Sequence, residues 1–198
     1  FDPANLSRLF HIKSTDFIEA LLLPDLLPQM AQLSPQSQIK TTSSGFGLPK
    51  ASLESGESDL AIAGFFGDLP DGFYQQRLFQ DGFLSCARED HPRLGRKKKL
   101  SIPDFCQERH ALIAPSGDLK SKLDRQLDKK TPRFVEVGLS SFMASGWVVS
   151  QTDTVLTAPS RLIHLIGEAF PIKTFSPPVS IPKISIVQVW HERNHQDK

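Results

Sequence analysis

Residues 10–19 read FHIKSTDFIE, and this segment predicts a strand that runs directly into a helix. The strand is expected over residues 6–13, where apolar side chains recur. Asp16 is then expected to be the N-cap of the helix, with Glu19 three residues later, a spacing similar to the capping box found at helix N-termini. A strand followed at once by a helix is the repeating unit of α/β proteins, so the segment indicates that fold class.

The same alternation of strands and helices continues along the chain. Further strands are expected over residues 38–43, 59–65, 77–88 (one extended strand or a bent pair), 111–114, 133–139, 154–158, 173–175 and 184–190. Further helices are expected over residues 50–55, 101–107, 142–149 and 160–170, and as an amphipathic helix around Leu119, Leu123 and Leu127. Gly56 is expected to stop the first of these helices, and Ser101 is expected to cap the second. The helix that begins near residue 16 contains Pro24 and Pro28, which are expected to interrupt it. Strands separated by helices favour parallel βαβ units, and there are too many strands here for one small sheet, so two sheets are expected.

Two sheets imply two domains that share the chain. The extended segment 77–88 and the proline-rich segment 176–182 are expected to cross from one domain to the other. Residues 1–76 with 181–198 then form the first domain, and residues 77–180 form the second. A ligand cleft is expected between two domains that are joined in this way.

Composition excludes several classes of protein. Of the 198 residues, 39% are hydrophobic and 23% are charged, which is ordinary for a globular protein and excludes wholesale disorder. No apolar run reaches the roughly 18 to 20 residues that a membrane span needs. The chain begins with Phe-Asp-Pro and has no initiator Met, so we expect a segment upstream of it.

The net charge of +1 conceals one basic cluster. Five of the 23 basic residues are Arg93, Arg96, Lys97, Lys98 and Lys99. Without them, 18 basic residues stand against 22 acidic ones, so the body of the chain is slightly acidic and has no broad electrostatic footprint for nucleic acid. The cluster is interpreted as a solvated loop, with a phosphate-binding patch as the alternative.

The two cysteines, Cys86 and Cys106, do not form a disulfide framework. Two reduced and mostly buried thiols are expected, with a single disulfide as the alternative.

Residues 191–195 read HERNH and match the H-E-x-x-H motif of zinc hydrolases. That chemistry needs both histidines on one face of a helix, whereas this motif follows an expected strand. Three residues remain after His195, and no upstream pattern supplies a third ligand. The sequence also contains no P-loop, G-x-G-x-x-G or G-x-S-x-G motif, so neither a metal nor a cofactor nor a catalytic centre is expected.

Hydroxyl-bearing residues stand where three expected strands end. Ser14 and Thr15 lie between the first strand and the first helix, Ser116 follows the strand at 111–114, and Ser141 precedes Phe142 at the start of another helix. Ligands of open α/β sheets bind at the carboxyl ends of strands, where helix N-termini offer free N–H groups. Capping of the helices explains the same residues equally well, and the two roles are compatible.

Several segments together resemble the effector-binding domain of LysR-type transcriptional regulators over essentially the whole chain. The segments are FDP (1–3), FHIKSTD (10–16), LESGESDLAI (53–62), LF (78–79), CAREDHP (86–92), VV (148–149), TDTV (152–155), APSRL (158–162) and WHE (190–192). The closing Trp-His is most similar to the branch that contains nodulation and aromatic-catabolism regulators. In that branch Trp-His ends a strand, which also argues against a zinc site.

The resemblance implies a fold and a set of partners. It implies two Rossmann-like subdomains joined by a two-strand crossover hinge, as in type II periplasmic binding proteins. It implies a small anionic or aromatic effector, a cytoplasmic location, no membrane and no enzymatic activity. It implies a homodimer, with a tetramer for the full-length protein, and DNA binding only through an upstream winged helix-turn-helix. The slightly acidic body agrees with this last point, so the chain alone is not expected to bind a specific operator.

The resemblance also assigns effector contacts by position. These are Ser14, Thr15, Gly64, Phe65, Phe66, Ser116, Ser141, Phe142, Thr157 and Val189. Some relatives that respond to aromatic acids have His before the Phe, where this chain has Ser141. A secreted solute-binding protein of the same fold, serving a transporter, is the alternative function.

Overall fold

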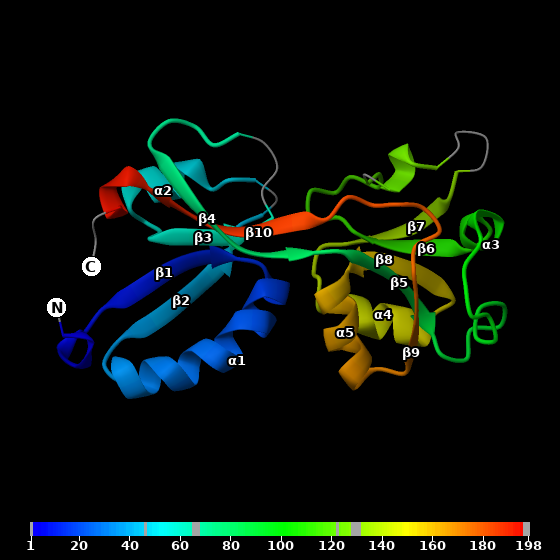
Figure 1. Ribbon diagram of the computed structural model, residues 1–198, viewed down its shortest axis with the longest axis horizontal. Coiled ribbons are helices and arrows are strands. Elements are labelled where there is room, and N and C mark those ends of the chain that lie inside the picture. The colour runs from blue at the N-terminus through cyan, green and yellow to red at the C-terminus, as the bar shows by residue number, and fades with distance from the viewer. Residues whose placement is uncertain (1, 46, 65–67, 122, 128–131, 196–198) are drawn as a thin grey trace. The chain divides into compact units, whose positions relative to one another are not determined.

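The computed structural model describes residues 2–45, 47–64, 68–121, 123–127 and 132–195. The chain divides into two compact units, which are Phe1–Gln80 with Ser185–Lys198 (unit 1) and Asp81–Ile184 (unit 2). Each unit contains one five-stranded sheet, so the predicted α/β class with two sheets is confirmed (Figure 1). The expected division into residues 1–76 with 181–198 and residues 77–180 stays a prediction.

Unit 1 is built on a sheet with the strand order β2-β1-β3-β10-β4. Its strands are β1 (Leu9–Ser14), β2 (Gln38–Ser43), β3 (Leu60–Ala63), β4 (Phe73–Asp81) and β10 (Ile184–His191). Its helices are α1 (Asp16–Leu33) and α2 (Lys50–Ser55), with 3-10 turns at Pro3–Asn5 and Glu192–Asn194. β1 pairs in parallel with β2 and β3, whereas β10 pairs antiparallel with β3. The carboxyl ends of β1, β2 and β3 therefore lie at one edge of this sheet.

Helix α1 differs from its prediction at the cap and at the prolines. Thr15, rather than Asp16, is the N-cap, and its Oγ1 accepts the N–H of Ile18 at 3.4 Å. The helix continues through Pro24 and Pro28 to its end, and both prolines are exposed. Each proline removes one backbone donor from the helix, and both lie on its exposed side, where solvent is accessible to the carbonyl groups that lose a partner.

The core of unit 1 joins α2 to the sheet. Leu53 of α2 packs with Ala61, Phe73, Val187 and Val189 from three strands. Gly56 ends α2 in the left-handed region with φ +78°, as the sequence predicted, because this conformation disfavours residues with a Cβ. The short helix thereby fixes the position of the strand that follows it.

Unit 2 is built on a sheet with the strand order β7-β6-β8-β5-β9. Its strands are β5 (Phe83–Arg88), β6 (Arg109–Ile113), β7 (Phe134–Leu139), β8 (Thr154–Pro159) and β9 (Ile172–Phe175). Its helices are α3 (Ile102–Cys106), α4 (Ser145–Gln151) and α5 (Ser160–Ala169), with a 3-10 turn at Leu123–Arg125. β6 pairs in parallel with β7 and β8, whereas β5 pairs antiparallel with β8 and β9. Residues 77–88 were expected to form either one extended strand or a bent pair of strands. They form a pair, because Gly82 separates β4 from β5.

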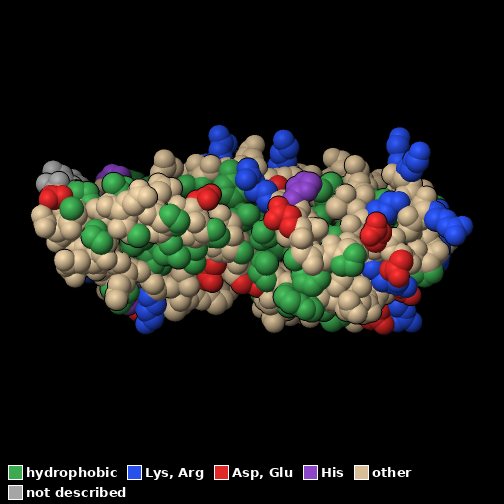
Figure 2. Space-filling model, turned by 90° about the horizontal axis from the view of Figure 1, so that it is seen from below, with side chains coloured by type: hydrophobic (Ala, Val, Ile, Leu, Met, Phe, Trp, Pro, Cys, Tyr) green, Lys and Arg blue, Asp and Glu red, His purple; other side chains and the backbone are tan. Residues whose placement is uncertain are grey.

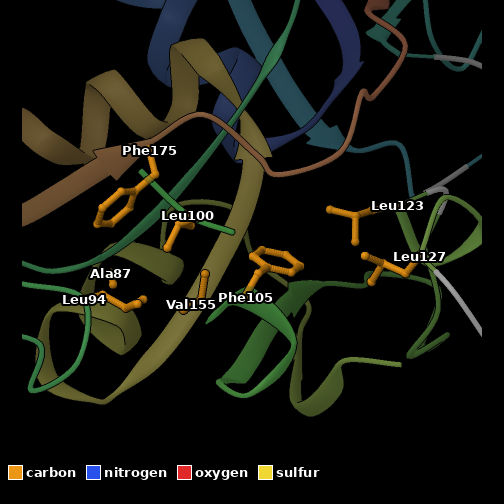
Figure 3. Packing of buried hydrophobic residues seen from close by; sticks show 8 residues of the cluster. All are labelled: Ala87, Leu94, Leu100, Phe105, Leu123, Leu127, Val155 and Phe175. Atoms are coloured by element: carbon orange, nitrogen blue, oxygen red, sulfur yellow. The ribbon is translucent and has the colours of Figure 1, made fainter. Parts of the chain in front are cut away.

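One cluster of buried hydrophobic side chains holds unit 2 together (Figure 3). It joins strands β5, β8 and β9 to α3 and to two connecting segments. Its members are Ala87, Leu94, Leu100, Phe105, Leu123, Leu127, Val155 and Phe175.

The amphipathic helix predicted around Leu119, Leu123 and Leu127 is wrong. In the described part of this segment the helical structure is the single turn Leu123–Arg125. Leu123 and Leu127 are buried in the core cluster, whereas Leu119 is 49% exposed, so the three leucines do not form one buried stripe.

An ion pair between Asp124 and Arg133 holds the turn that this segment forms. Asp124 Oδ2 accepts the N–H of Ser121 at 2.6 Å, and Oδ1 accepts Nε of Arg133 at 2.7 Å. The side chain of Arg133 is almost fully buried. Burial raises the pKa of Asp124, but hydrogen bonds from Arg133 and Ser121 lower it more, so the net shift is downward.

Two expectations from composition concern thiols and membranes. Both cysteines are free, and burial raises the pKa of Cys86 to about 12. Burial also raises the pKa of Cys106, against the lowering effect of the positive charge on Arg133.

Among the helices that the structure describes, none combines the length and apolarity needed to cross a bilayer.

His110 is a titratable group within unit 2 that has no exposed surface. Its Nε2 lies 2.8 Å from the carbonyl oxygen of Phe105, which can only accept, so Nε2 carries the proton. The rings of Phe105 and His110 lie 4.4 Å apart. Burial lowers the pKa of His110 to about 4, which makes the neutral ring the form that the folded state requires.

We expect acid to destabilise the fold through His110. Its pKa is near 6.5 when unfolded and about 4 when folded, so the unfolded chain takes up the proton first as pH falls. The contribution is complete above pH 6.5 and is lost as pH falls toward 4. Between pH 7 and pH 5 the loss is about 2 kcal/mol of unfolding free energy. Urea unfolding at both pH values should show this loss in the native chain and not in His110→Gln; equal losses in both proteins would show that His110 is not its source.

Candidate functional site

The carboxyl edge of the unit 1 sheet carries a group of hydroxyl side chains. Ser14 ends β1 and lies in register with Ser43, which ends the parallel strand β2. The N–H of Ser44 donates to the carbonyl oxygen of Ser14 at 2.9 Å. Gly64 follows β3 at the same edge, whereas Phe65 and Phe66 lie outside the described residues. The structure therefore brings Ser14, Thr15 and Gly64 together within unit 1.

Ser14 and Thr15 differ in how far their hydroxyl groups are already used. Ser14 is 2% exposed, and its Oγ donates to the carbonyl oxygen of Ile62 at 3.4 Å. Thr15 is half-buried and caps α1 through the bond to Ile18, which is also long at 3.4 Å. A bond of this length is weak, because such bonds are usually 2.7–3.2 Å long. Of the two hydroxyl groups, that of Thr15 is the more available to a ligand.

Val189 lies in the hydrophobic core of unit 1. It has no exposed surface and packs in the cluster with Leu53, Ala61 and Phe73. Its side chain thus stabilises the sheet and α2, and it reaches a ligand only if that packing changes.

The carboxyl edge of unit 2 repeats the arrangement with other residues. Ser116 follows β6 in an exposed turn, and Ser141 and Phe142 follow β7. Thr157 lies near the end of β8, and these three strands are parallel neighbours. Their predicted site residues therefore lie along one edge of one sheet. Gly117 allows the turn after β6 because it adopts φ +84°.

Ser141 stabilises a turn, and the helix predicted after it begins later than expected. The helix predicted over residues 142–149 begins at Ser145. Ser141 Oγ accepts the N–H of Ala144 at 3.0 Å, which fixes a turn before the helix. Phe142 lies in that turn and is half-buried.

Sequence reasoning missed two partners of the predicted residues. Ser85 of β5 has no exposed surface, and its Oγ lies 2.7 Å from Oγ1 of Thr157. This pair depends on the antiparallel register of two strands that are far apart in sequence, so no local signal reveals it. Ser43 could have been found from the sequence, because it stands at the end of the strand expected over residues 38–43, just as Ser14 stands directly after the strand expected over residues 6–13.

The histidines of the H-E-x-x-H segment pack against aromatic rings. His191 ends β10 and meets the ring of Phe73 at 5.1 Å between centroids. The ring of His195 stacks on Tyr74 at 3.8 Å and accepts the indole N–H of Trp190 at 3.3 Å. The described part of the chain contains no group of three or more His, Cys, Asp or Glu side chains placed to hold a metal ion.

A shallow hollow of about 800 Å³ lies elsewhere on unit 2. It is lined by Arg88, Glu89, Asp90, Ser150, Gln151, Thr152, Asp153 and Pro171. Arg88 forms ion pairs with Asp90 and Asp153, so its charge is already balanced. Asp153 precedes β8, whereas Thr157 lies toward the other end of that strand, so the hollow is not part of the hydroxyl-bearing edge.

Similarity to known proteins covers the whole chain. The family model described as the LysR substrate binding domain matches residues 3–198. The HTH-type transcriptional activator NagR of a Ralstonia species is 32% identical over 201 residues, which cover 100% of this chain and 65% of NagR. NahR of Pseudomonas putida, also an HTH-type transcriptional activator, is 31% identical with the same coverage. The chain thus spans less than two thirds of the length of these relatives.

Solved structures agree with the family match. A probable transcriptional regulator of Pseudomonas aeruginosa, PA0477, superposes with a TM-score of 0.87 at 28% identity, covering 98% of this chain and 64% of that one. The regulatory domain of MexT, a transcriptional activator of the same organism, shares the fold with a TM-score of 0.82 at 22% identity and covers 98% and 93% of the two chains.

We expect the Ser85–Thr157 pair to stabilise unit 2. Thr157→Val leaves the buried hydroxyl of Ser85 without its partner and should lower the free energy of unfolding by about 1–3 kcal/mol. The double variant Ser85→Ala/Thr157→Val removes both hydroxyl groups and should lose less than the two single variants together. Denaturant unfolding of the four proteins measures this coupling, and additive losses would show that the two hydroxyl groups do not depend on each other.

Proposed function

This chain belongs to the LysR substrate-binding-domain family, and we propose that it is the effector-sensing and oligomerisation domain of a DNA-binding transcriptional regulator. The observation that carries the proposal is the family match over residues 3–198. The resemblance to LysR-type effector domains inferred from the sequence is thereby confirmed. The similar proteins are transcriptional activators and regulators, which favours this function over that of a transporter's solute-binding protein.

The effector is proposed to bind through the carboxyl edges of the sheets. In unit 1 the proposed contacts are Ser14, Thr15 and Gly64, the core residue Val189, and Phe65 and Phe66, which lie outside the described residues. In unit 2 they are Ser116, Ser141, Phe142 and Thr157. The support in both units is the same: helix starts and strand ends collect hydroxyl and backbone N–H groups at one edge of a parallel sheet. Such groups suit a small molecule with a carboxylate, carbonyl or hydroxyl group, and Phe142 suits an aromatic ring.

The effector acts through its affinity for two states of the domain. A ligand shifts an equilibrium only if it binds one arrangement more tightly than the other. The proposal therefore includes a change of conformation that alters how DNA-binding domains in the full-length protein engage DNA. It also includes a cytoplasmic location and no enzymatic activity, both supported by the names of the relatives.

The proposal includes a homodimer formed through α1, and a tetramer for the full-length protein. Only Phe17 and Ile18 of this 18-residue helix are buried, although its sequence is rich in leucine. Leu27 is 50% exposed and Leu33 is 63% exposed. Figure 2 shows hydrophobic side chains spread over the part of the surface to which α1 belongs. Large apolar side chains that are exposed together on one surface mark protein–protein contacts, so a second copy is the expected cover.

Unit 2 offers an exposed aromatic side chain for the same contact. Trp147 of α4 is 65% exposed and meets Phe170 edge-on at 4.6 Å. The proposed dimer places α1 of one copy against a helix of unit 2 of its partner. Large exposed aromatic side chains are enriched at such interfaces.

Thr15→Val tests the binding role of the α1 start. The change keeps the shape of the side chain and removes its hydroxyl group, which should weaken effector binding by roughly ten- to hundred-fold. An effector is first found by thermal-shift screening of small aromatic acids and uncharged aromatic compounds, and its affinity is then measured by calorimetry. Thr42→Val, on an exposed position of β2, is the matched control and should bind normally. Unchanged affinity of Thr15→Val with a stability loss of about 1 kcal/mol would leave only the capping role.

Leu27→Asp tests the dimer. A buried charge at an apolar interface is strongly unfavourable, so the variant should be a monomer by light scattering at protein concentrations where the native chain is a dimer. Ile102→Asp, which changes a comparably exposed residue of α3, should remain dimeric. A native chain that is monomeric at tens of micromolar, or a Leu27→Asp variant that still dimerises, contradicts the proposed interface.

A further inference from the structure

The cluster of basic residues found in the sequence forms a loop of unit 2 between β5 and α3. We call residues 93–99 the basic loop. Leu94 within it is 1% exposed and Leu100 directly after it is 8% exposed, and both belong to the core cluster of unit 2 (Figure 3). The loop is therefore anchored in the core at two points.

Hydrogen bonds also fix the backbone of the basic loop. Nδ1 of the buried His91 accepts the N–H groups of Arg93 and Leu94 at 3.2 and 3.1 Å. The N–H of Gly95 donates to the carbonyl oxygen of His91 at 2.8 Å, and Lys173 Nζ donates to that of Gly95 at 2.7 Å. A Cβ on Gly95 would lie 2.8 Å from two backbone oxygens, so the turn requires glycine. Hydrogen bonds thus define the backbone of residues 93–95, the first part of the basic loop.

Two of the five cations are neutralised by acids of the same unit. Arg93 Nε lies 3.2 Å from Oε1 of Glu108, and Lys97 Nζ lies 2.6 Å from Oδ1 of Asp104.

The other three cations have no such partner. Arg96, Lys98 and Lys99 are exposed, and no acid of the described residues lies within ion-pair distance of them. These three are therefore the cations of the loop that remain available to an external anion.

The three unpaired cations lie close together along the chain. The Cα atoms of Arg96 and Lys99 are at most about 11 Å apart, because each residue spans at most about 3.6 Å. One strand of duplex DNA carries a phosphate per roughly 3.4 Å of helix axis, so three consecutive phosphates span two intervals, or about 7 Å of axis. The long side chains of these cations can therefore reach neighbouring phosphates of one strand.

We propose that the basic loop contacts the phosphate backbone of duplex DNA through Arg96, Lys98 and Lys99. The inference rests on the proposed function, because a domain of a DNA-binding regulator is held close to DNA by the rest of its protein. The contact is independent of sequence and adds to the operator recognition that the proposal assigns to a separate domain. It revises the expectation that this part of the protein takes no part in DNA binding.

Fluorescence anisotropy of this chain with a labelled 25-base-pair duplex tests the contact. Three phosphate contacts predict a slope of about −2.7 for the logarithm of the binding constant against that of salt concentration, or a roughly forty-fold loss between 50 and 200 mM KCl. Two duplexes of unrelated sequence should bind equally. The variant Arg96→Gln/Lys98→Gln/Lys99→Gln should lose most of the binding at 50 mM KCl and most of the slope.

The matched control is Lys40→Gln/Arg77→Gln/Lys183→Gln, which removes the same charge from three other exposed positions. It should bind DNA with the native slope, and both triple variants should melt like the native chain.

Three results would overturn the proposal: no binding by the native chain, native binding by the loop variant, or equal losses in both variants. Tighter loop-dependent binding to vesicles with phosphatidylserine than to DNA would also overturn it, in favour of a membrane surface. Effector affinity of the loop variant, measured in parallel, should be native, which separates failure of this contact from failure of the proposed function.

Discussion

Parallel pairing of neighbouring strands is the constraint on which the rest of this structure depends. Once β1 lies in parallel with β2 and β3, their carboxyl ends must share one edge of the sheet. The same holds for β6 with β7 and β8 in the other unit. The segments that leave these strands then bring serine, threonine and glycine to that edge, since turns and helix caps favour such residues. The candidate binding groups are thus collected by topology.

Satisfaction of buried polar groups is the second influence, and it limits which of those groups remain available. Ser14 and Thr157 each lie within hydrogen-bond distance of a group inside their own unit. The imidazole of His110 and the guanidinium of Arg133 are likewise held by internal acceptors. An unpaired buried donor costs more than a bond contributes, so the fold uses most of its interior hydroxyl groups for itself. The exposed Ser116 and the weakly bonded Thr15 are the better candidates for a ligand.

Predictions from sequence were correct for features that depend on residues nearby in the chain, and they failed for features that depend on distant residues. The bounds of α2 and β2 and the capping of α3 were predicted correctly, because a glycine stop, a turn or a serine cap lies within a few residues of what it controls. The helix expected around Leu119 is wrong, and the segment is held instead by the ion pair between Asp124 and Arg133, which residue spacing alone does not encode. Pro24 and Pro28 did not end α1, because its exposed side tolerates missing backbone bonds.

The sequence by itself determined the α/β class, the two sheets, the family and the positions of most strands. All of these depend on local patterns or on segments that can be compared directly. Only the tertiary structure decided that Val189 lies in a core, that Ser85 meets Thr157, and that the histidines of the H-E-x-x-H segment pack against aromatic rings. It also decided which cations of the basic loop have acidic partners. The physical reason is that hydrogen bonds, ion pairs and burial depend on distance in space, and the partners of these residues come from other elements of the fold.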